Sequence, residues 1–317
     1  MTRDIYRALP AKGSANDVYK KEAGPMKRKA GARRTMENII HGIFLLLGLV
    51  TVGCVLLITV YLIISGIPAI REIGLIDFMF GREWASTAAE PAYGILPFIL
   101  TSVYGTAGAI LLGVPVGFMT AVYLSKAAPK RIKAIVSSAV SLLAGIPSVV
   151  YGLVGMLVLV PAIRTAFKVP DGSSLLAAII VLAVMILPSI IKVSMTALDA
   201  VPEEYEQASL ALGATREETW FRVSVPAAKS GIAAAVVLGV GRAIGEAMAV
   251  MMVSGNVPNM PELFQSVRFL TTAVASEMSY SAGLQRQALF SIALVLFMFI
   301  MLINALLNLL LKGRKER

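Results

Sequence analysis

The sequence predicts an all-α, polytopic membrane protein with six transmembrane helices and a helix-turn-helix in one of its loops. Its 317 residues are 57% hydrophobic and 15% charged. The mean hydropathy of +0.78 is too apolar for a water-soluble chain of this length. Six apolar runs each reach the roughly 20 residues that a helix needs to cross a bilayer. The polar stretch between the fourth and fifth runs, residues 202–226, carries the start and stop signals of two short helices.

The six spans are expected, in chain order, at residues 41–65, 95–124, 134–160, 174–197, 229–254 and 286–311. The first is too long, and lies too far behind a charged leader, to be a cleaved signal peptide, so we expect it to stay as an anchor. The spans and their loops form the predicted transmembrane domain, residues 39–312. A basic tail precedes it at residues 1–38, and another follows it at residues 313–317.

Lys and Arg are distributed unevenly over the predicted loops. With the N-terminus inside, 22 of the 29 basic residues fall in inner segments and six in outer segments, while Arg242 lies within a span. Because cytoplasmic loops carry such an excess, we expect a multi-pass protein of the cell (inner) membrane. Both termini and the loop 199–228 are then cytoplasmic. The net charge of +10 reflects this topology and contact with membrane lipid.

The N-terminal tail and the outer loops allow more than one interpretation. We expect the tail to be disordered at the membrane surface. It is not expected to bind nucleic acid, because no basic run is interleaved with aromatic residues on a folded face. In the outer loop 66–93, the aromatic residues Phe78, Phe80 and Trp84 cap the outer mouth, contact a partner, or lie in an interfacial aromatic belt.

The motifs of the obvious catalytic classes are missing from the sequence. It contains no G-x-x-x-x-G-K-[ST] phosphate loop, no H-E-x-x-H, no G-x-S-x-G and no pair of intramembrane aspartates. We therefore expect no catalytic residue, and no ATP hydrolysis by this chain. Cys54 is the only cysteine and no metal-ligand cluster is present, so neither a disulfide, a metal nor a cofactor is expected.

Two opposite charges lie inside the fifth predicted span. Arg242 and Glu246 are four residues apart, and hence on one face of a helix, in an otherwise uncharged segment. A charge at the bilayer centre costs about 2.5–3.5 kcal/mol on insertion scales, so the pair requires mutual pairing, an aqueous cavity, or both. A functional role is the first hypothesis and a structural ion pair the alternative. In the same helix, Gly241-x-x-x-Gly245 indicates a seam that another helix approaches closely.

The polar stretch 202–226 predicts two short helices at an angle. Pro202 suits a first helical position, Gly213 suits the left-handed residue after a helix, and Thr215 with Glu218 suits a capping box that begins the second helix. Both helices have an apolar side, made by Tyr205, Ala208 and Leu212 on the first and by Trp220, Phe221 and Val223 on the second. Such a loop indicates a docking surface for another protein. An ordinary amphipathic connector is the alternative.

The same stretch resembles the cytoplasmic coupling loop of ABC-importer permeases, whose pattern is E-A-A, three residues, G, nine residues, I, one residue, L-P. Gly213 and Pro226 match both fixed positions, whereas Gln207 stands where the family has Glu and Ser209 replaces the second Ala. Glu206 points roughly 100° away on a helix and does not substitute for that Glu. The resemblance implies that an ATPase subunit docks on Tyr205, Gln207, Ala208, Ser209, Leu212, Gly213 and Pro226.

Four motifs resemble the PstC-type permeases of phosphate-specific ABC importers, within the binding-protein-dependent transport permeases of the type I fold. The sister PstA type usually continues R-A-I-G-E with Thr-Ala-Pro, where this chain has Met-Ala-Val after Ala247. That difference favours PstC, although PstC has Thr at the place of Ala247. The four motifs are Y-G-I-L-P-F at 93–98, A-G-I-P-S-V-V-Y-G-L at 144–153, A-S-L-A-L-G-A-T at 208–215 and G-R-A-I-G-E-A-M-A-V-M-M-V-S-G-N at 241–256.

The resemblance implies import of inorganic phosphate by alternating access. It further implies a PstA-like second permease as the heterodimer partner, two copies of a PstB-like ATPase subunit, and an extracytoplasmic PstS-like phosphate-binding protein. A permease for sulfate, molybdate or phosphonate remains an alternative, because one arginine does not choose among tetrahedral anions. From other classes, a membrane-embedded enzyme or an autonomous channel stays open.

In the implied mechanism, Arg242 contacts phosphate through its two-pronged guanidinium. Glu246 either holds Arg242 in place between cycles or repels the anion towards release. The Gly and Pro residues between 145 and 152 mark either a broken helix or a simple kink. If the helix is broken, freed backbone N–H groups near Ser148 and Tyr151 contact the anion.

Overall fold

A computed structural model describes residues 26–312 of the chain, in two units that divide between Val60 and Tyr61. Helix α2 (Met26–Ile73) starts well before the predicted first span and ends after it. Residues 26–38 are therefore helical, where a disordered tail was expected. Met, Lys, Arg and Ala, which dominate this segment, are good helix formers and no proline interrupts them. The rest of that tail, residues 1–25, and the predicted tail 313–317 lie outside the described residues.

Three long helices form the centre of the second unit: α4 (Leu96–Val122), α8 (Leu175–Asp199) and α12 (Lys229–Gly245). Helix α8 packs against both others. Three glycines of α4 let it approach closely, because a Cβ on each of these three would lie 2.7–2.9 Å from an isoleucine carbon of α8. The facing residues are Gly108 and Ile179, Gly113 and Ile186, and Gly117 and Ile190. The predicted second and fourth spans are thus confirmed as single helices, and they pack against each other.

The predicted third and fifth spans are each divided. Residues 134–160 do not form one helix: α5 (Lys130–Gly145) ends before Pro147, and α6 (Ser148–Val154) leads through the π-helical turn η2 (Gly155–Leu159) into α7 (Val160–Phe167). Residues 229–254 are divided into α12 and α13 (Met248–Val253). Among the described residues, five helices are long and apolar enough to span a membrane. A sixth span is reached by joining 216–227 to 229–245 across a 72° bend.

The last span is α15 (Gly283–Lys312), close to its predicted position. The part of α2 that belongs to the second unit packs on it. The Tyr61 ring meets that of Phe290 edge to face, with centroids 5.4 Å apart. The Ser291 hydroxyl donates to the Gly66 carbonyl oxygen at 2.6 Å.

The loops that were predicted to lie outside gather at one end of the second unit. They contain α3 (Leu75–Phe80), the antiparallel strands β1 (Trp84–Ala85) and β2 (Ala92–Tyr93), and α14 (Leu270–Glu277). Phe78 and Trp84 are buried there, while Phe80 is exposed. The Trp84 ring contacts those of Tyr93 and Phe98. Phe78 and Trp84 therefore belong to a packed cap, because a membrane-belt position would leave them on the surface.

The opposite end carries the polar stretch 202–226. It folds into α9 (Glu203–Ala211), α10 (Arg216–Thr219), the π-helical turn η3 (Trp220–Ser224) and α11 (Val225–Ala227). A second π-helical turn, η1 (Tyr123–Ala127), ends α4 nearby. The far end of α15 lies at this end of the unit as well, as the predicted alternation of spans requires.

Candidate substrate pathway and docking surface

Two helices break with the same backbone geometry. After α5, Ile146 is extended with φ −72° and ψ 129°, and after α12, Glu246 is extended with φ −75° and ψ 127°. The first break follows from Pro147, which lacks a backbone N–H and disfavours helical geometry in the residue before it. The sequence predicted this break as one of two possibilities. It did not predict the second, because no proline follows Gly245.

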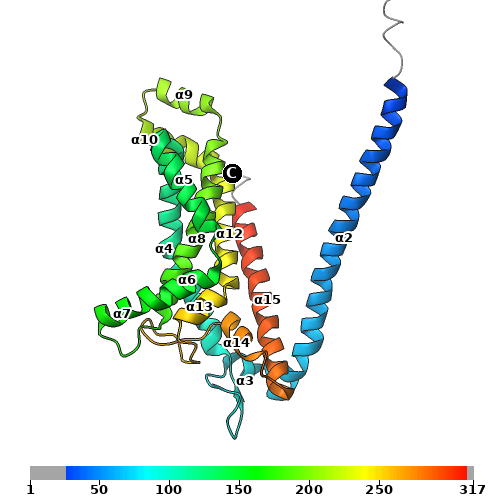
Figure 1. Cartoon of the computed structure of the whole chain (residues 1–317), viewed down its shortest axis with the longest axis vertical. Coiled ribbons are helices and arrows are strands. Elements are labelled where there is room, and N and C mark those ends of the chain that lie inside the picture. Colours follow the sequence, from blue (N-terminus) through cyan, green and yellow to red (C-terminus); the bar gives the residue numbers. More distant parts are fainter. Residues whose placement is uncertain (1–25, 313–317) are drawn as a thin grey trace, which may run out of the picture. The chain divides into compact units, whose positions relative to one another are not determined.

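The half-helices after the two breaks pack against each other. Gly152 of α6 meets Ala249 of α13 so closely that a Cβ on Gly152 would lie 2.8 Å from the Ala249 Cα atom. Gly155 of η2 likewise meets Val253. Small residues therefore let two backbones touch where both helices are interrupted. The two breaks are brought to neighbouring places in the fold (Figure 1).

Arg242 lies in the last turn of α12, one turn before the second break, and is half-buried. Over residues 26–312, no ion pair or hydrogen bond of its guanidinium is found. Mutual pairing with Glu246, one of the possibilities that the sequence left open, is therefore not seen. The helix ends before Glu246, whose carboxylate bonds to the Ala249 amide instead. A Cβ on Gly241 or Gly245 would meet nothing within 4 Å. The seam predicted there is open in this chain.

Glu246 caps the half-helix that follows the break. Its Oε1 accepts a hydrogen bond from the backbone N–H of Ala249 at 3.0 Å. Its own carbonyl oxygen accepts from the Thr271 hydroxyl of α14 at 2.8 Å. A carboxylate that receives a first-turn amide stabilises a helix start. Glu246 thus holds α13 in position and ties the break to α14.

The structure brings Tyr151 close to Arg242, within range of an electrostatic interaction. Its hydroxyl donates to the Leu143 carbonyl oxygen at 2.7 Å, which spans the first break and braces α6 against α5. Ser148 is half-buried at the first position of α6, and no partner of its hydroxyl is found among the described residues. Of the two, Ser148 is the side chain whose hydroxyl hydrogen is left to donate to an anionic ligand.

The local signals of the docking loop are confirmed by its geometry. Gly213 has φ +88°, the left-handed conformation that glycine adopts without a steric cost. Thr215 and Glu218 form a complete capping box. The hydrogen bond from the Thr215 backbone N–H, followed by the charge of Arg222, lowers the pKa of the Glu218 carboxyl. Pro202 precedes α9 as its N-cap, one position earlier than expected.

Apolar side chains of this loop face solvent. Leu212 is 90% exposed at the turn and Tyr205 is 55% exposed on α9. Gln207, Ala208 and Pro226 are exposed as well. A soluble surface seldom keeps large apolar residues together at a tip unless a partner covers them. The structure thus gathers six of the seven predicted docking positions on or beside an exposed surface.

Ser209 is the exception, because it points into the loop. Its hydroxyl lies 2.9 Å from the Thr219 hydroxyl of α10, and Thr219 is buried. The residue that departs from the family's Ala therefore joins the two short helices to each other. Sequence reasoning lacked the signal for this contact, since Thr219 is one of several polar residues in α10.

Two acidic residues near the loop were not predicted as functional. Glu206 pairs with Lys126 of η1 at 2.6 Å and accepts a hydrogen bond from the Ser224 hydroxyl at 2.8 Å. Asp199, at the end of α8, accepts from Ser125 at 2.6 Å and pairs with Lys133 at 3.1 Å. The predicted direction of Glu206, away from Gln207, agrees with this placement. Its partner is distant in the sequence, so no local pattern indicates the pair.

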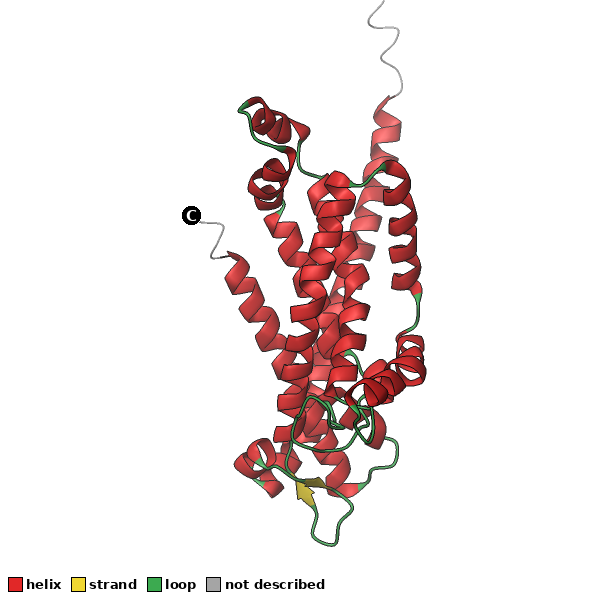
Figure 2. Cartoon of the chain, turned by 90° about the vertical axis from the view of Figure 1, so that its left-hand side faces the viewer, coloured by secondary structure: helices red, strands yellow, loops and turns green. Residues whose placement is uncertain are grey.

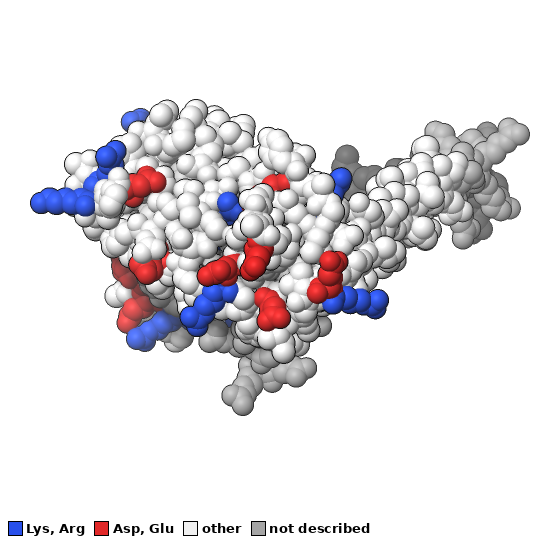
Figure 3. All heavy atoms as spheres, turned by 90° about the horizontal axis from the view of Figure 1, so that it is seen from below, with Lys and Arg blue, Asp and Glu red and all other residues white. Residues whose placement is uncertain are grey.

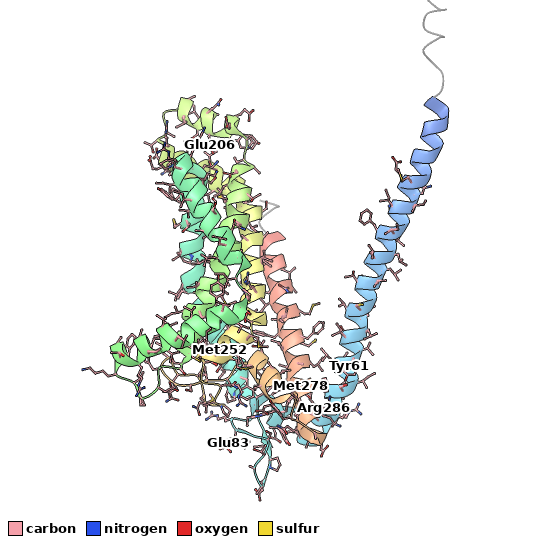
Figure 4. The ribbon with its side chains drawn as sticks, viewed as in Figure 1. Tyr61, Glu83, Glu206, Met252, Met278 and Arg286 are labelled. Carbon is pink, nitrogen blue, oxygen red and sulfur yellow. The ribbon has the colours of Figure 1, made fainter. Side chains whose placement is uncertain are left out.

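A polar cluster at the other end centres on Glu277 of α14. Its carboxylate pairs with Arg268 and accepts from the Trp84 indole and the Gln285 amide. Arg268 also donates to the Asn256 carbonyl oxygen at 2.9 Å. These bonds fasten the cap of β1 and β2 to α14 and α15. The cluster joins elements on the side opposite to Glu206 (Figure 4).

An open pocket of about 660 Å³ lies beside that cap. Glu72, Asp77 and Glu83 contribute its acidic side chains and Arg82 a basic one, so both signs of charge meet on this face (Figure 3). Burial raises the pKa of Tyr93, which also lines the pocket, and the charge of Glu72 raises it further.

The fold is that of the membrane-spanning subunits of ABC importers. A chain in the crystal structure of a bacterial alginate ABC transporter, in complex with its alginate-bound periplasmic protein, superposes with a TM-score of 0.58. The superposition covers 90% of this chain and 98% of that one at 16% identity. The predicted fold class, a polytopic all-α protein of the type I permease kind, is confirmed.

The chain belongs to the family of binding-protein-dependent transport system inner membrane components, which matches residues 113–315. The probable ABC transporter permease protein YqgH of Bacillus subtilis is 39% identical over 81% of this chain and 86% of that protein. The phosphate transport system permease protein PstC of Haemophilus influenzae is 32% identical over 82% of this chain and 88% of its own length. The predicted resemblance to PstC-type permeases is therefore confirmed, and this is a multi-pass membrane protein.

Proposed function

We propose that this chain is one of two transmembrane subunits of an ABC importer that moves inorganic phosphate into the cytoplasm. The observation that carries the proposal is Arg242, a half-buried guanidinium at a helix break with no carboxylate partner among residues 26–312. An unpaired charge within a membrane protein is costly, and a bound anion offsets that cost. The guanidinium fork matches two oxygens of phosphate. The relatives named PstC support phosphate as the anion.

The surroundings of Arg242 supply what a transient anion site needs. Ser148 brings a hydroxyl and the first N–H groups of α6 to the break, and such amides attract anions. Tyr151 and Glu246 brace the two breaks through Leu143 and Ala249. The proposed pathway thus consists of two residues that contact phosphate, Arg242 and Ser148, and two that hold the breaks open, Tyr151 and Glu246.

Separate subunits supply the energy and complete the pathway. Two copies of a PstB-like ATPase dock on the importer. One binds the exposed loop of this chain at Leu212 and Tyr205, and the other binds the corresponding loop of the second permease subunit. A PstA-like permease covers the open face at Gly241 and Gly245. A PstS-like phosphate-binding protein delivers the anion at the cap. The chain itself has no ATPase site in this proposal, in keeping with the missing phosphate-loop motif.

The proposed orientation places the docking loop and both termini in the cytoplasm of the cell (inner) membrane. The excess of Lys and Arg in the corresponding segments supports it. The placement of α9 and the end of α15 on one side, with α3 and α14 on the other, is compatible with it (Figure 2). Residues 1–38 and 313–317 are then cytoplasmic tails of one transmembrane domain, 39–312.

Copurification from native membranes, combined with uptake in cells, tests this proposal. We expect the tagged chain to bring down a second permease and an ATPase subunit. Cells that lack the chain should lose high-affinity uptake of labelled phosphate, and excess sulfate should leave uptake in the complemented cells unchanged. Competition by sulfate, molybdate or a phosphonate would assign another oxyanion. Uptake that persists without any copurifying ATPase would contradict an ABC importer.

A further inference from the structure

Two π-helical turns, η1 and η3, lie beside α9 of the docking loop. The turn η1 ends the membrane span that contains α4, and η3 begins the path from α10 towards α12. A π-helical turn accommodates one residue more than an α-helical turn, so the helix beyond it changes its direction or its rotation when the turn converts. Each of the two helices that pack against α8, α4 and α12, therefore has a turn that can rearrange at its docking-loop end.

Glu206 connects both turns to α9. Its carboxylate receives Lys126 of η1 at 2.6 Å and Ser224 of η3 at 2.8 Å. Ser224 is fully buried, and the Lys126 and Glu206 side chains are only 11% and 24% exposed. Charge-assisted hydrogen bonds of this length between partly buried side chains are among the strongest hydrogen bonds in proteins. A movement of α9 therefore displaces η1 and η3 together.

Glu206 points away from the surface that faces the ATPase subunit. Leu212 and Tyr205 are exposed, whereas the Glu206 carboxylate is turned inward towards Lys126. Lys133 and Asp199 form a second pair on the same side, and Ser125 joins Asp199 to η1. That second pair is more open to solvent, with side chains 36% and 41% exposed, so it contributes less.

We propose that Glu206, with Lys126 and Ser224, is the positioning group that transmits movement of the docked ATPase subunit from α9 to α4 and α12. The proposal rests on the proposed function and adds to it the residues of this chain that couple docking to transport. Docking itself does not need Glu206, because other side chains make that surface. Removing Glu206 should therefore uncouple the two activities without separating the subunits.

The assembled complex in proteoliposomes, with its ATPase subunits and binding protein, allows the test. In Glu206→Gln and in Lys126→Gln, we expect copurification of the ATPase subunit and basal ATP hydrolysis to stay within about twofold of wild type. Stimulation of ATP hydrolysis by phosphate-loaded binding protein should fall about tenfold, because a charge-assisted bond is lost. Ser224→Ala removes one neutral hydrogen-bond partner and should reduce stimulation about fivefold. Glu204→Gln, an exposed carboxylate of the same helix, is the matched control and should behave as wild type.

Charge exchange separates transmission from mere stability. Lys126→Glu combined with Glu206→Lys restores an ion pair of opposite polarity and should recover most of the stimulation that either change alone removes. Three outcomes would each overturn the proposal. They are unchanged stimulation in Glu206→Gln, an equal loss of stimulation in Glu204→Gln, and stimulation in the exchange variant no higher than in the single variants. Loss of the ATPase subunit from Glu206→Gln would overturn it too, because the role would then be docking.

The proposed function can fail without affecting this test, and the reverse also holds. A wild-type complex that hydrolyses ATP in response to a different loaded binding protein would refute phosphate as the substrate. The ratio of stimulated to basal ATP hydrolysis in each variant would still measure the coupling through Glu206. A wild-type complex that imports phosphate, with full coupling in every variant, would leave the function standing and refute the role of Glu206.

Discussion

Arg242 and Glu246 occupy adjacent turns of the chain but have different surroundings. Arg242 ends α12 beside open space at Gly241 and Gly245, whereas the Glu246 carboxylate receives the Ala249 amide and caps α13. A structural ion pair would neutralise the Arg242 guanidinium and leave it unavailable to an anion. With Glu246 occupied elsewhere, the guanidinium stays available to an anion, and the two side chains have separable roles.

The first prediction concerns the shape of the Arg242 head group. Arg242→Lys keeps the positive charge but loses the bidentate fork. We expect ATP-driven phosphate uptake to fall at least about tenfold, the equivalent of one lost charge-assisted hydrogen bond. Complex yield and basal ATP hydrolysis should be retained. Uptake by the variant at the wild-type rate would show that Arg242 does not bind the anion through its fork.

Neutralising both charges provides the control for that prediction. Glu246→Gln leaves an amide oxygen that can still accept from Ala249, so we expect the α13 cap and complex yield to be retained. Arg242→Gln combined with Glu246→Gln should assemble and still fail to import phosphate. Recovery of uptake in this double variant, relative to Arg242→Gln alone, would restore the structural ion pair as the better explanation.

Both helix breaks are built from common local features, but only one could be predicted. Pro147 in the sequence indicates a break or a kink at the first site. The second break is held by two hydrogen bonds, from the Ala249 backbone N–H to the Glu246 carboxylate and from the Thr271 hydroxyl to the Glu246 carbonyl oxygen. The bond from Thr271 forms only when α14 is in place. The apolar run 229–254 therefore predicts one continuous helix, and the placement of Arg242 and Glu246 on one face followed from that incorrect continuity.

The second prediction tests the contact between the two half-helices. Gly152→Ala places a methyl group 2.8 Å from the Ala249 Cα, and overpacking of this kind costs about 1–3 kcal/mol. We expect a lower thermal stability of the purified complex, measured by tryptophan fluorescence, and lower uptake. Gly145→Ala is the matched control, because its Cβ would meet nothing within 4 Å. Equal stability of the two variants would refute close packing at Gly152.

The third prediction concerns the turn of the docking loop. Gly213 has φ +88° and open space around a Cβ, so a side chain there is opposed by backbone strain alone. Gly213→Val should cost about 1–2 kcal/mol and reduce phosphate-dependent ATP hydrolysis, while membrane insertion is retained. Gly213→Asn is the control, since Asn tolerates the left-handed conformation. Normal ATPase activity in the Val variant would contradict docking through this turn.

The arrangement of spans and loops could largely be predicted from the sequence, since apolar length and turn signals decide most of it. Three of six spans and the capping box at Thr215 lie close to where they were expected. The contacts that unite distant segments could not be predicted. Glu206 with Lys126, Ser209 with Thr219, and Glu277 with Arg268 join residues whose neighbours in the sequence give no sign of the partner.

The fourth prediction concerns the orientation of the chain in the membrane. In a Cys54→Ala background, single cysteines at Ser14, Glu217 and Thr87 report on the N-terminal tail, the docking loop and the outer cap. Glu217 and Thr87 are exposed, so their replacement disturbs no packing. We expect an impermeant thiol reagent to label only position 87 in intact cells or spheroplasts. Labelling of position 217 from outside would invert the loop and contradict the permease assignment.

Reconstitution of the purified complex gives the most direct measurement of what this chain does. Proteoliposomes that contain the chain, its second permease and the ATPase subunits are loaded with ATP and supplied with phosphate-bound binding protein. We predict that labelled phosphate accumulates inside against its gradient, that accumulation requires ATP, and that a hundredfold excess of sulfate leaves the initial rate unchanged. Accumulation of sulfate instead of phosphate, or phosphate movement that continues without ATP, would contradict a phosphate importer driven by its ATPase subunits.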